Sequence, residues 1–143
     1  MSTLVFLEHH GSAIQKGSLG VLTKAVSLDP ETDAVLIGSG VAGLAETAGK
    51  YGAQRVFVAE GEALEAPLPQ PRVDVIAQIV KDQGHANVLF AASVLSSDIA
   101  GGLSARLDAG LNWDLNGLEM DGGNLVGKRS ALGDTIRADV GWS

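Results

Sequence analysis

The order of apolar segments along the chain constrains its fold more strongly than any other feature of the sequence. Four short runs are apolar at nearly every position, and stretches with helical spacing separate them. These runs are residues 3–7, 34–37, 56–59 and 87–92. Continuous rather than alternating apolar character is typical of strands that are covered on both faces. Because strands that alternate with helices form right-handed βαβ units, the sequence predicts a parallel sheet between helical layers.

The stretches between the runs, with their end signals, predict the helices. We expect helices over about residues 18–28, 73–83 and 99–107, and one that leads from the turn at Gly43 to about Tyr51. Ser18 is the candidate cap of the first helix, and Ser97 or Asp98 that of the last. Residues 61–72 hold three prolines and are predicted to form a loop, long enough to favour a contact with another molecule.

The chain changes character after Leu111. Residues 118–121 and 124–130 flank the sequence Asp121-Gly122-Gly123, which predicts a β-hairpin, and residues 135–140 are expected to add a strand. The predicted fold class is therefore α/β, with a three-layer, Rossmann-like parallel sheet followed by an antiparallel C-terminal extension.

Composition and charge exclude several classes of protein. The 143 residues suffice for about one domain, and 45% hydrophobic against 19% charged residues excludes wholesale disorder. Without Cys there are no disulfides and no thiolate zinc sites. A net charge of −7 disfavours nucleic acid as a partner. The N-terminus lacks signal-peptide features, and no apolar run reaches the roughly 20 residues that span a bilayer. We therefore expect a cytoplasmic protein without membrane insertion.

A glycine-rich turn is the clearest candidate for a binding site. Residues 38–43 match the pattern G-x-G-x-x-G through Gly38, Gly40 and Gly43, and Glu60 follows 22 positions after Gly38. In a dinucleotide site such glycines allow close approach of a pyrophosphate, and the acid accepts ribose hydroxyls. The alternative is a strand-to-helix turn in which small residues serve packing. With 19 glycines in the chain, accidental spacings are expected, and both interpretations stay open.

Two other groups of polar residues are candidates for chemistry, and neither completes a catalytic constellation. His9, His10 and His85 have no carboxylate at metal-ligand spacing, so we expect loop histidines and no metal site. The remaining candidates are Ser93, Ser96, Ser97 and Asp98, which suit helix capping better than a hydrolase nucleophile with a histidine as its base. We therefore expect no enzyme.

Two tryptophans lie in the C-terminal part of the chain. Trp113 and Trp142 each stand beside polar or small residues. An aromatic side chain in such a place anchors a partner or fills a core, and the sequence leaves both possibilities open.

Four segments together resemble one known family. They are residues 4–9 (Leu-Val-Phe-Leu-Glu-His), 50–59, 89–114 and 129–141. This set resembles the N-terminal domain of the electron transfer flavoprotein α subunit, although Ser96-Ser97-Asp98 stands where that family has Gly-Arg-Asp, and Gly133-Asp134 where it has Gly-Asn. The resemblance implies a fold like that of adenine nucleotide alpha hydrolase-like domains. It also implies that the glycine-rich turn of this chain is a vestige of a nucleotide site or a packing turn.

The resemblance also carries functional expectations. It implies a scaffold and partner-binding domain that pairs with an electron transfer flavoprotein β subunit. The complete protein would carry electrons from flavin dehydrogenases to a quinone oxidoreductase of the respiratory chain. Members of the family are about twice as long and hold FAD mainly in a C-terminal domain. We therefore expect residues 1–143 to be a truncated N-terminal-like domain that binds no FAD by itself. An absent last strand would leave a sheet edge open to strand exchange or dimerisation.

Overall fold

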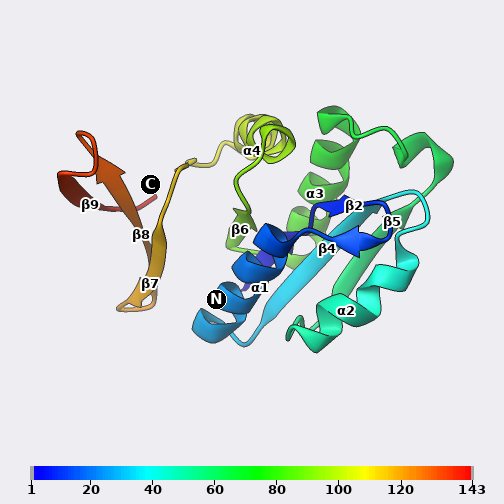
Figure 1. Ribbon diagram of the computed structural model, residues 1–143, viewed down its shortest axis with the longest axis horizontal. Coiled ribbons are helices and arrows are strands. Elements are labelled where there is room, and N and C mark those ends of the chain that lie inside the picture. Colours follow the sequence, from blue (N-terminus) through cyan, green and yellow to red (C-terminus); the bar gives the residue numbers. More distant parts are fainter. Residues whose placement is uncertain (1, 143) are drawn as a thin grey trace.

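The computed structural model describes residues 2–142, and its centre is a four-stranded parallel sheet (Figure 1). The strand order is β5-β4-β1-β6. The strands are β1 (Thr3–Phe6), β4 (Thr32–Gly38), β5 (Val56–Glu60) and β6 (Asn87–Phe90). The four predicted apolar runs are therefore the four strands of this sheet. Every residue of β1 and of β4 is buried, which explains why their sequences do not alternate.

Helices cover both faces of this sheet and complete three layers. On one face α1 (Lys16–Leu28) and α2 (Ala45–Lys50) pack on alternate strand residues such as Val5 and Leu36. On the other face α3 (Pro69–Gln83) and α4 (Val94–Leu107) pack on Leu4, Phe6 and Val35. The predicted Rossmann-like α/β architecture is confirmed. None of the helices within residues 2–142 combines the length and the apolar character needed to cross a membrane.

Two of the predicted helix caps are wrong. Helix α1 begins at Lys16, so Ser18 lies inside it, buried, where its hydroxyl accepts the backbone N–H of Glu8. Helix α4 begins at Val94, and its cap is Ser93 rather than Ser97 or Asp98. The helix predicted over residues 99–107 therefore begins five residues earlier than expected. Ser93 is itself a favourable cap, and its hydroxyl accepts the backbone N–H of Ser96 at 3.0 Å.

The proline-rich stretch is shorter as a loop than predicted. Helix α3 already begins at Pro69, and a short 3₁₀ helix, η2 (Glu62–Leu64), lies within the connection. Pro69 and Pro71 stand in the first turn of α3, where backbone N–H groups have no intrahelical partner, so proline costs nothing there. Three further small elements follow strand ends: β2 (His9–His10), β3 (Ala13–Ile14) and the 3₁₀ helix η1 (Ala42–Leu44).

The predicted antiparallel extension is confirmed as a separate three-stranded sheet. It consists of β7 (Gly117–Asp121), β8 (Asn124–Ala131) and β9 (Ile136–Val140). Gly122 and Gly123 both have positive φ, at 56° and 84°, as a two-residue hairpin turn requires. Figure 1 shows this sheet on the β6 side of the molecule, joined to α4 by an extended connection.

Candidate functional site

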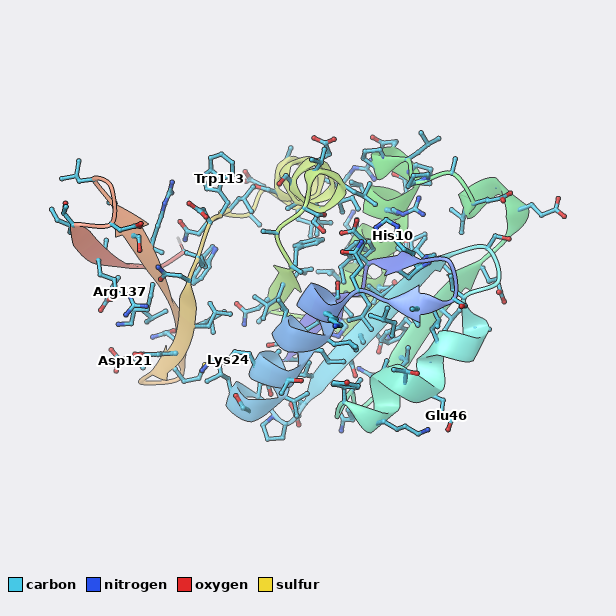
Figure 2. The ribbon with its side chains drawn as sticks, viewed as in Figure 1. His10, Lys24, Glu46, Trp113, Asp121 and Arg137 are labelled. Atoms are coloured by element: carbon cyan, nitrogen blue, oxygen red, sulfur yellow. The ribbon has the colours of Figure 1, made fainter. Side chains whose placement is uncertain are left out.

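The carboxyl edge of the parallel sheet gathers most of the candidate residues. The chain runs from β1 to β4 and β5 on one side and then returns to β6 on the other side of β1. The switch point thus lies beside β1, where open α/β sheets usually bind ligands. Figure 2 shows His10, just beyond the end of β1, at this edge.

A buried carboxylate joins β1 to α4 at the switch point. Glu8 is only 8% exposed, and its Oε2 accepts hydrogen bonds from the hydroxyls of Ser93 at 2.6 Å and Ser96 at 3.4 Å. Ser97 donates to the carbonyl of Ser93, and Asp98 is exposed. The serines therefore hold a protein carboxylate and the start of a helix. Sequence reasoning found the serines and missed Glu8, whose partners lie more than 80 positions away.

A buried guanidinium holds the connection after β5. Arg72 is 3% exposed and donates from Nη1 to the carbonyls of Ala66 (3.0 Å) and Leu68 (3.1 Å), and from Nη2 to that of Leu64 (3.2 Å). Burial lowers the pKa of Arg72, and the negative charge of Glu8 partly opposes that shift. The sequence carried a signal for this role, since Arg72 stands four positions before Ile76 on the apolar face of α3.

The ring of His9 explains why the first residue of the glycine-rich turn, Gly38, is a glycine. The ring Nε2 of His9 donates to the carbonyl of Ile37 at 3.1 Å, which leaves Nδ1 buried without a partner among the described residues. A Cβ on Gly38 would lie 2.7 Å from that Nε2 and 2.9 Å from Cγ1 of Val41. Gly38 is therefore required by packing of the protein against itself.

The structure brings the predicted nucleotide-binding residues together. Gly38 and Glu60 are register partners on β4 and β5, and Oε1 of Glu60 accepts the backbone N–H of Ala42 in the turn at 3.4 Å. Gly40 has φ +67°, whereas a Cβ on Gly43 would meet open space. The turn leads into η1 and then into the six-residue α2, so it opens a short helix only. Binding of a nucleotide here stays a prediction.

A small cavity of about 250 Å³ lies at this edge between β2 and the connection held by Arg72. Its walls include Phe6, Glu8, His10, Glu65 and Arg72. The hydrogen bonds of Glu8 and Arg72 described above go to the protein itself. The cavity is thus lined by two buried charged side chains, Glu8 and Arg72, whose hydrogen bonds are already made within the protein.

The third histidine takes part in an ion network at the opposite, amino edge of the sheet. Asp33 accepts Nε of Arg55 at 3.1 Å and Nη2 at 2.6 Å, and Nε2 of His85 lies 2.8 Å from its Oδ2. Burial raises the pKa of Asp33, but the hydrogen bonds from Arg55 and His85 outweigh this effect and hold the pKa below its usual value. The three histidines are therefore not brought together. Within residues 2–142 no cluster of three or more His, Asp or Glu side chains could hold a metal ion.

The tryptophans line a larger groove elsewhere. A cavity of about 1800 Å³ separates β6, α1 and α4 from the C-terminal sheet, and both Trp113 and Trp142 border it. Trp113 is 64% exposed, with the guanidinium of Arg129 at 5.9 Å from its ring centroid. Figure 2 shows it projecting from the connection between α4 and β7. Core filling is therefore the wrong interpretation for Trp113.

The fold and the carboxyl edge of its parallel sheet together define a Rossmann-like α/β domain with an appended antiparallel sheet. Comparison with known proteins assigns its family. The family model of the electron transfer flavoprotein domain matches residues 3–142. The chain therefore belongs to the electron transfer flavoprotein family.

Individual relatives agree with that assignment. The chain is 36% identical over 139 residues to an electron transfer flavoprotein subunit alpha of Mycobacterium tuberculosis (strain CDC 1551 / Oshkosh), a match that covers 96% of this chain and 42% of the relative. It is 28% identical over 142 residues to Protein FixB of Clostridium saccharobutylicum, covering 95% of this chain and 42% of that protein. The chain thus spans less than half the length of these relatives.

Proposed function

We propose that residues 1–143 form the N-terminal-like scaffold and partner-binding domain of an electron transfer flavoprotein α subunit. The observation that carries this proposal is the family match over residues 3–142, together with relatives named as α subunits. In this role the domain pairs with a β subunit, and the assembly passes electrons from flavin dehydrogenases towards the respiratory chain. The domain acts in the cytoplasm and is no enzyme by itself, because the redox chemistry belongs to the flavin.

The carboxyl edge supports a scaffold role over a ligand-binding one. Glu8 is held by Ser93 and Ser96, Arg72 by backbone carbonyls, and Glu60 by the N–H of Ala42. Groups that a cofactor would use are thus engaged in joining one element of the domain to the next. FAD is then held by other parts of the assembly, namely a C-terminal domain and the partner subunit.

The cofactor part of this proposal is tested by flavin absorbance. The 143-residue chain, purified after expression in a flavin-replete host and after incubation with FAD, is expected to elute without stoichiometric flavin. Co-elution of one FAD per chain would contradict it. Partner binding is tested separately, by mixing the chain with an electron transfer flavoprotein β subunit.

A second candidate function is binding of an adenine nucleotide at the glycine-rich turn. The observation that favours it is the pairing of Gly38 with Glu60, which places the acid beside the turn. It predicts heat on titration with AMP or NAD in a calorimeter, weakened by the substitution Gly40→Val. A flat titration at millimolar ligand would remove this candidate.

A further inference from the structure

Asn116 stands where the connection from α4 enters the C-terminal sheet, and it is the only one of the four asparagines that a glycine follows. Its side chain is exposed, and its backbone lies in a bend just before β7. The backbone N–H of Asn116 donates to the carbonyl of Lys128 at 2.9 Å, which holds the bend against β8. Because Gly117 has no Cβ, nothing on that residue hinders attack of its backbone nitrogen on the preceding side chain.

Two side chains of the C-terminal sheet contact the two ends of the Asn116 amide group. Nη2 of Arg137 donates to Oδ1 at 3.4 Å, and Nδ2 donates to the hydroxyl oxygen of Ser130 at 2.6 Å. Ser130 and Arg137 are register partners on β8 and β9, so the sheet presents both side chains together. Figure 2 shows Arg137 in this sheet. A cation beside Oδ1 stabilises negative charge on that oxygen, and a hydroxyl beside Nδ2 is placed to give it a proton.

We propose that Asn116 is a site of spontaneous deamidation, in which Arg137 and Ser130 assist the loss of the side-chain amide. The backbone nitrogen of Gly117 gives its proton to a solvent base and bonds to Cγ of Asn116, while Arg137 stabilises the charge on Oδ1. The Cγ–Nδ2 bond then breaks, and ammonia leaves with a proton from the Ser130 hydroxyl, which water restores. A water molecule opens the succinimide ring and gives aspartate or isoaspartate at position 116. Nothing is oxidised or reduced, and water is the only co-reactant.

The products change the entry to the C-terminal sheet in two ways. Both place a carboxylate beside the guanidinium of Arg137, where the neutral amide was. Isoaspartate also adds a methylene group to the main chain directly before Gly117, the first residue of β7, which pairs with Lys128. Because strand pairing depends on register, the added group should loosen this first pair, whereas the pairs next to the hairpin turn stay closed. The modification needs no partner and is independent of the proposed function.

The test follows the folded 143-residue chain by peptide-mapping mass spectrometry during incubation in warm, neutral buffer. We expect the mass gain of one deamidation to accumulate at position 116, with both aspartate and isoaspartate peptides, which separate on chromatography. Asn124 is the internal control, because it is also exposed in the C-terminal sheet but is followed by Leu125. Its peptide should keep the mass of asparagine over the same period.

Variants of the two assisting residues separate the role of the fold from that of the Asn-Gly sequence. Arg137→Met and Ser130→Ala should each slow deamidation at position 116 about threefold or more, the size expected of an exposed charge contact. Arg129→Met is the matched control, because the Arg129 guanidinium lies over the ring of Trp113, and it should leave the rate unchanged.

The same rates are then measured in urea, where the contacts of the folded chain are absent. All the variants should there deamidate at the wild-type rate. The proposal is overturned if Asn116 stays intact in the folded chain while the unfolded chain deamidates. It is also overturned if the folded Arg137→Met or Ser130→Ala variant keeps the wild-type rate, or if either variant is slowed equally in urea.

Discussion

The hydroxyl of Ser93 lies 2.6 Å from Oε2 of Glu8, although 85 positions separate the two residues in sequence. This bond ties the end of the central strand β1 to the first turn of α4. The same hydroxyl accepts the backbone N–H of Ser96, so one side chain caps a helix and holds a buried carboxylate. Two layers of the domain are therefore fixed relative to each other by a polar contact.

A double-mutant cycle measures the strength of that contact. Ser93→Ala and Glu8→Gln should each lower the free energy of unfolding by about 1–2 kcal/mol, because a cap and a hydrogen bond to a charged group are lost. The coupling between them, from denaturant unfolding of both single variants and the double variant, should be about 1 kcal/mol. Ser97→Ala is the control, since Ser97 is exposed, and it should change stability by less than about 0.5 kcal/mol. Strict additivity would show that the bond contributes nothing.

Gly38 should not tolerate a methyl group. Gly38→Ala places a Cβ 2.7 Å from Nε2 of His9, and overpacking of this kind costs about 1–3 kcal/mol. Gly43→Ala, in the same turn, meets open space and should be neutral or slightly stabilising. Thermal unfolding of the two variants compares them directly. Because His9 causes part of the clash, and Val41 the rest, adding His9→Ala to Gly38→Ala should recover part of the lost stability. No recovery would refute the role of His9 in requiring this glycine.

Asp33 makes stability dependent on pH in the acid range. Because the folded-state pKa of Asp33 is depressed, its contribution is present above the unfolded value, about 3.8, and is lost as pH falls through the folded value. At neutral pH, Asp33→Asn should cost about 3 kcal/mol, since it leaves His85 and part of Arg55 without their charged partner. The difference between variant and wild type should narrow as pH is lowered below about 3.8. Asp74→Asn, which removes an exposed pair with Arg106, should cost less than about 0.5 kcal/mol at any pH. A difference that stayed constant down to the most acid pH would contradict the depressed pKa.

Arg72 should stabilise the connection before α3 more than it stabilises the parallel sheet. Arg72→Met keeps the aliphatic stem but removes the guanidinium hydrogen bonds to the carbonyls of Leu64, Ala66 and Leu68, at an expected cost of about 2–4 kcal/mol. Amide hydrogen exchange should accelerate over residues 61–68 and remain slow in β1 and β4. Arg72→Lys should recover little, because an ammonium group cannot reproduce the planar set of donors. Full recovery by lysine would show that charge alone matters.

The sequence predicted the strands and layers of this fold better than the points at which its helices begin. Continuous apolar runs identified the four strands, because strands buried on both faces have no polar alternation. The paired glycines 122 and 123 identified the hairpin of the C-terminal sheet. The start of α4 was misplaced because three serines and an aspartate all have side chains that can cap a helix. The cap that is used, Ser93, also donates to Glu8, a contact that is distant in sequence.

The candidate site shows the same limit. The pattern at Gly38, Gly40 and Gly43 is read in sequence as a nucleotide turn or a packing turn, and the ring of His9 shows that at least Gly38 serves packing. Arg72 and Glu8 are both buried at the sheet edge, and local periodicity barely signals either of them. Trp113 is exposed because it lies on the connection to the separate C-terminal sheet, a placement that no local pattern encodes.

The central claim is that the chain is a partner-binding domain of an electron transfer flavoprotein α subunit. The most direct test mixes the 143-residue chain with the purified β subunit of M. tuberculosis. Sedimentation velocity over a range of concentrations should show a 1:1 complex, and this complex should form without bound flavin. The variant Trp113→Ser removes an exposed aromatic side chain and shows whether the C-terminal part of the chain contributes to binding of the β subunit. The claim itself is decided by whether the wild-type complex forms. Two independent species that sediment unchanged at all concentrations would contradict it.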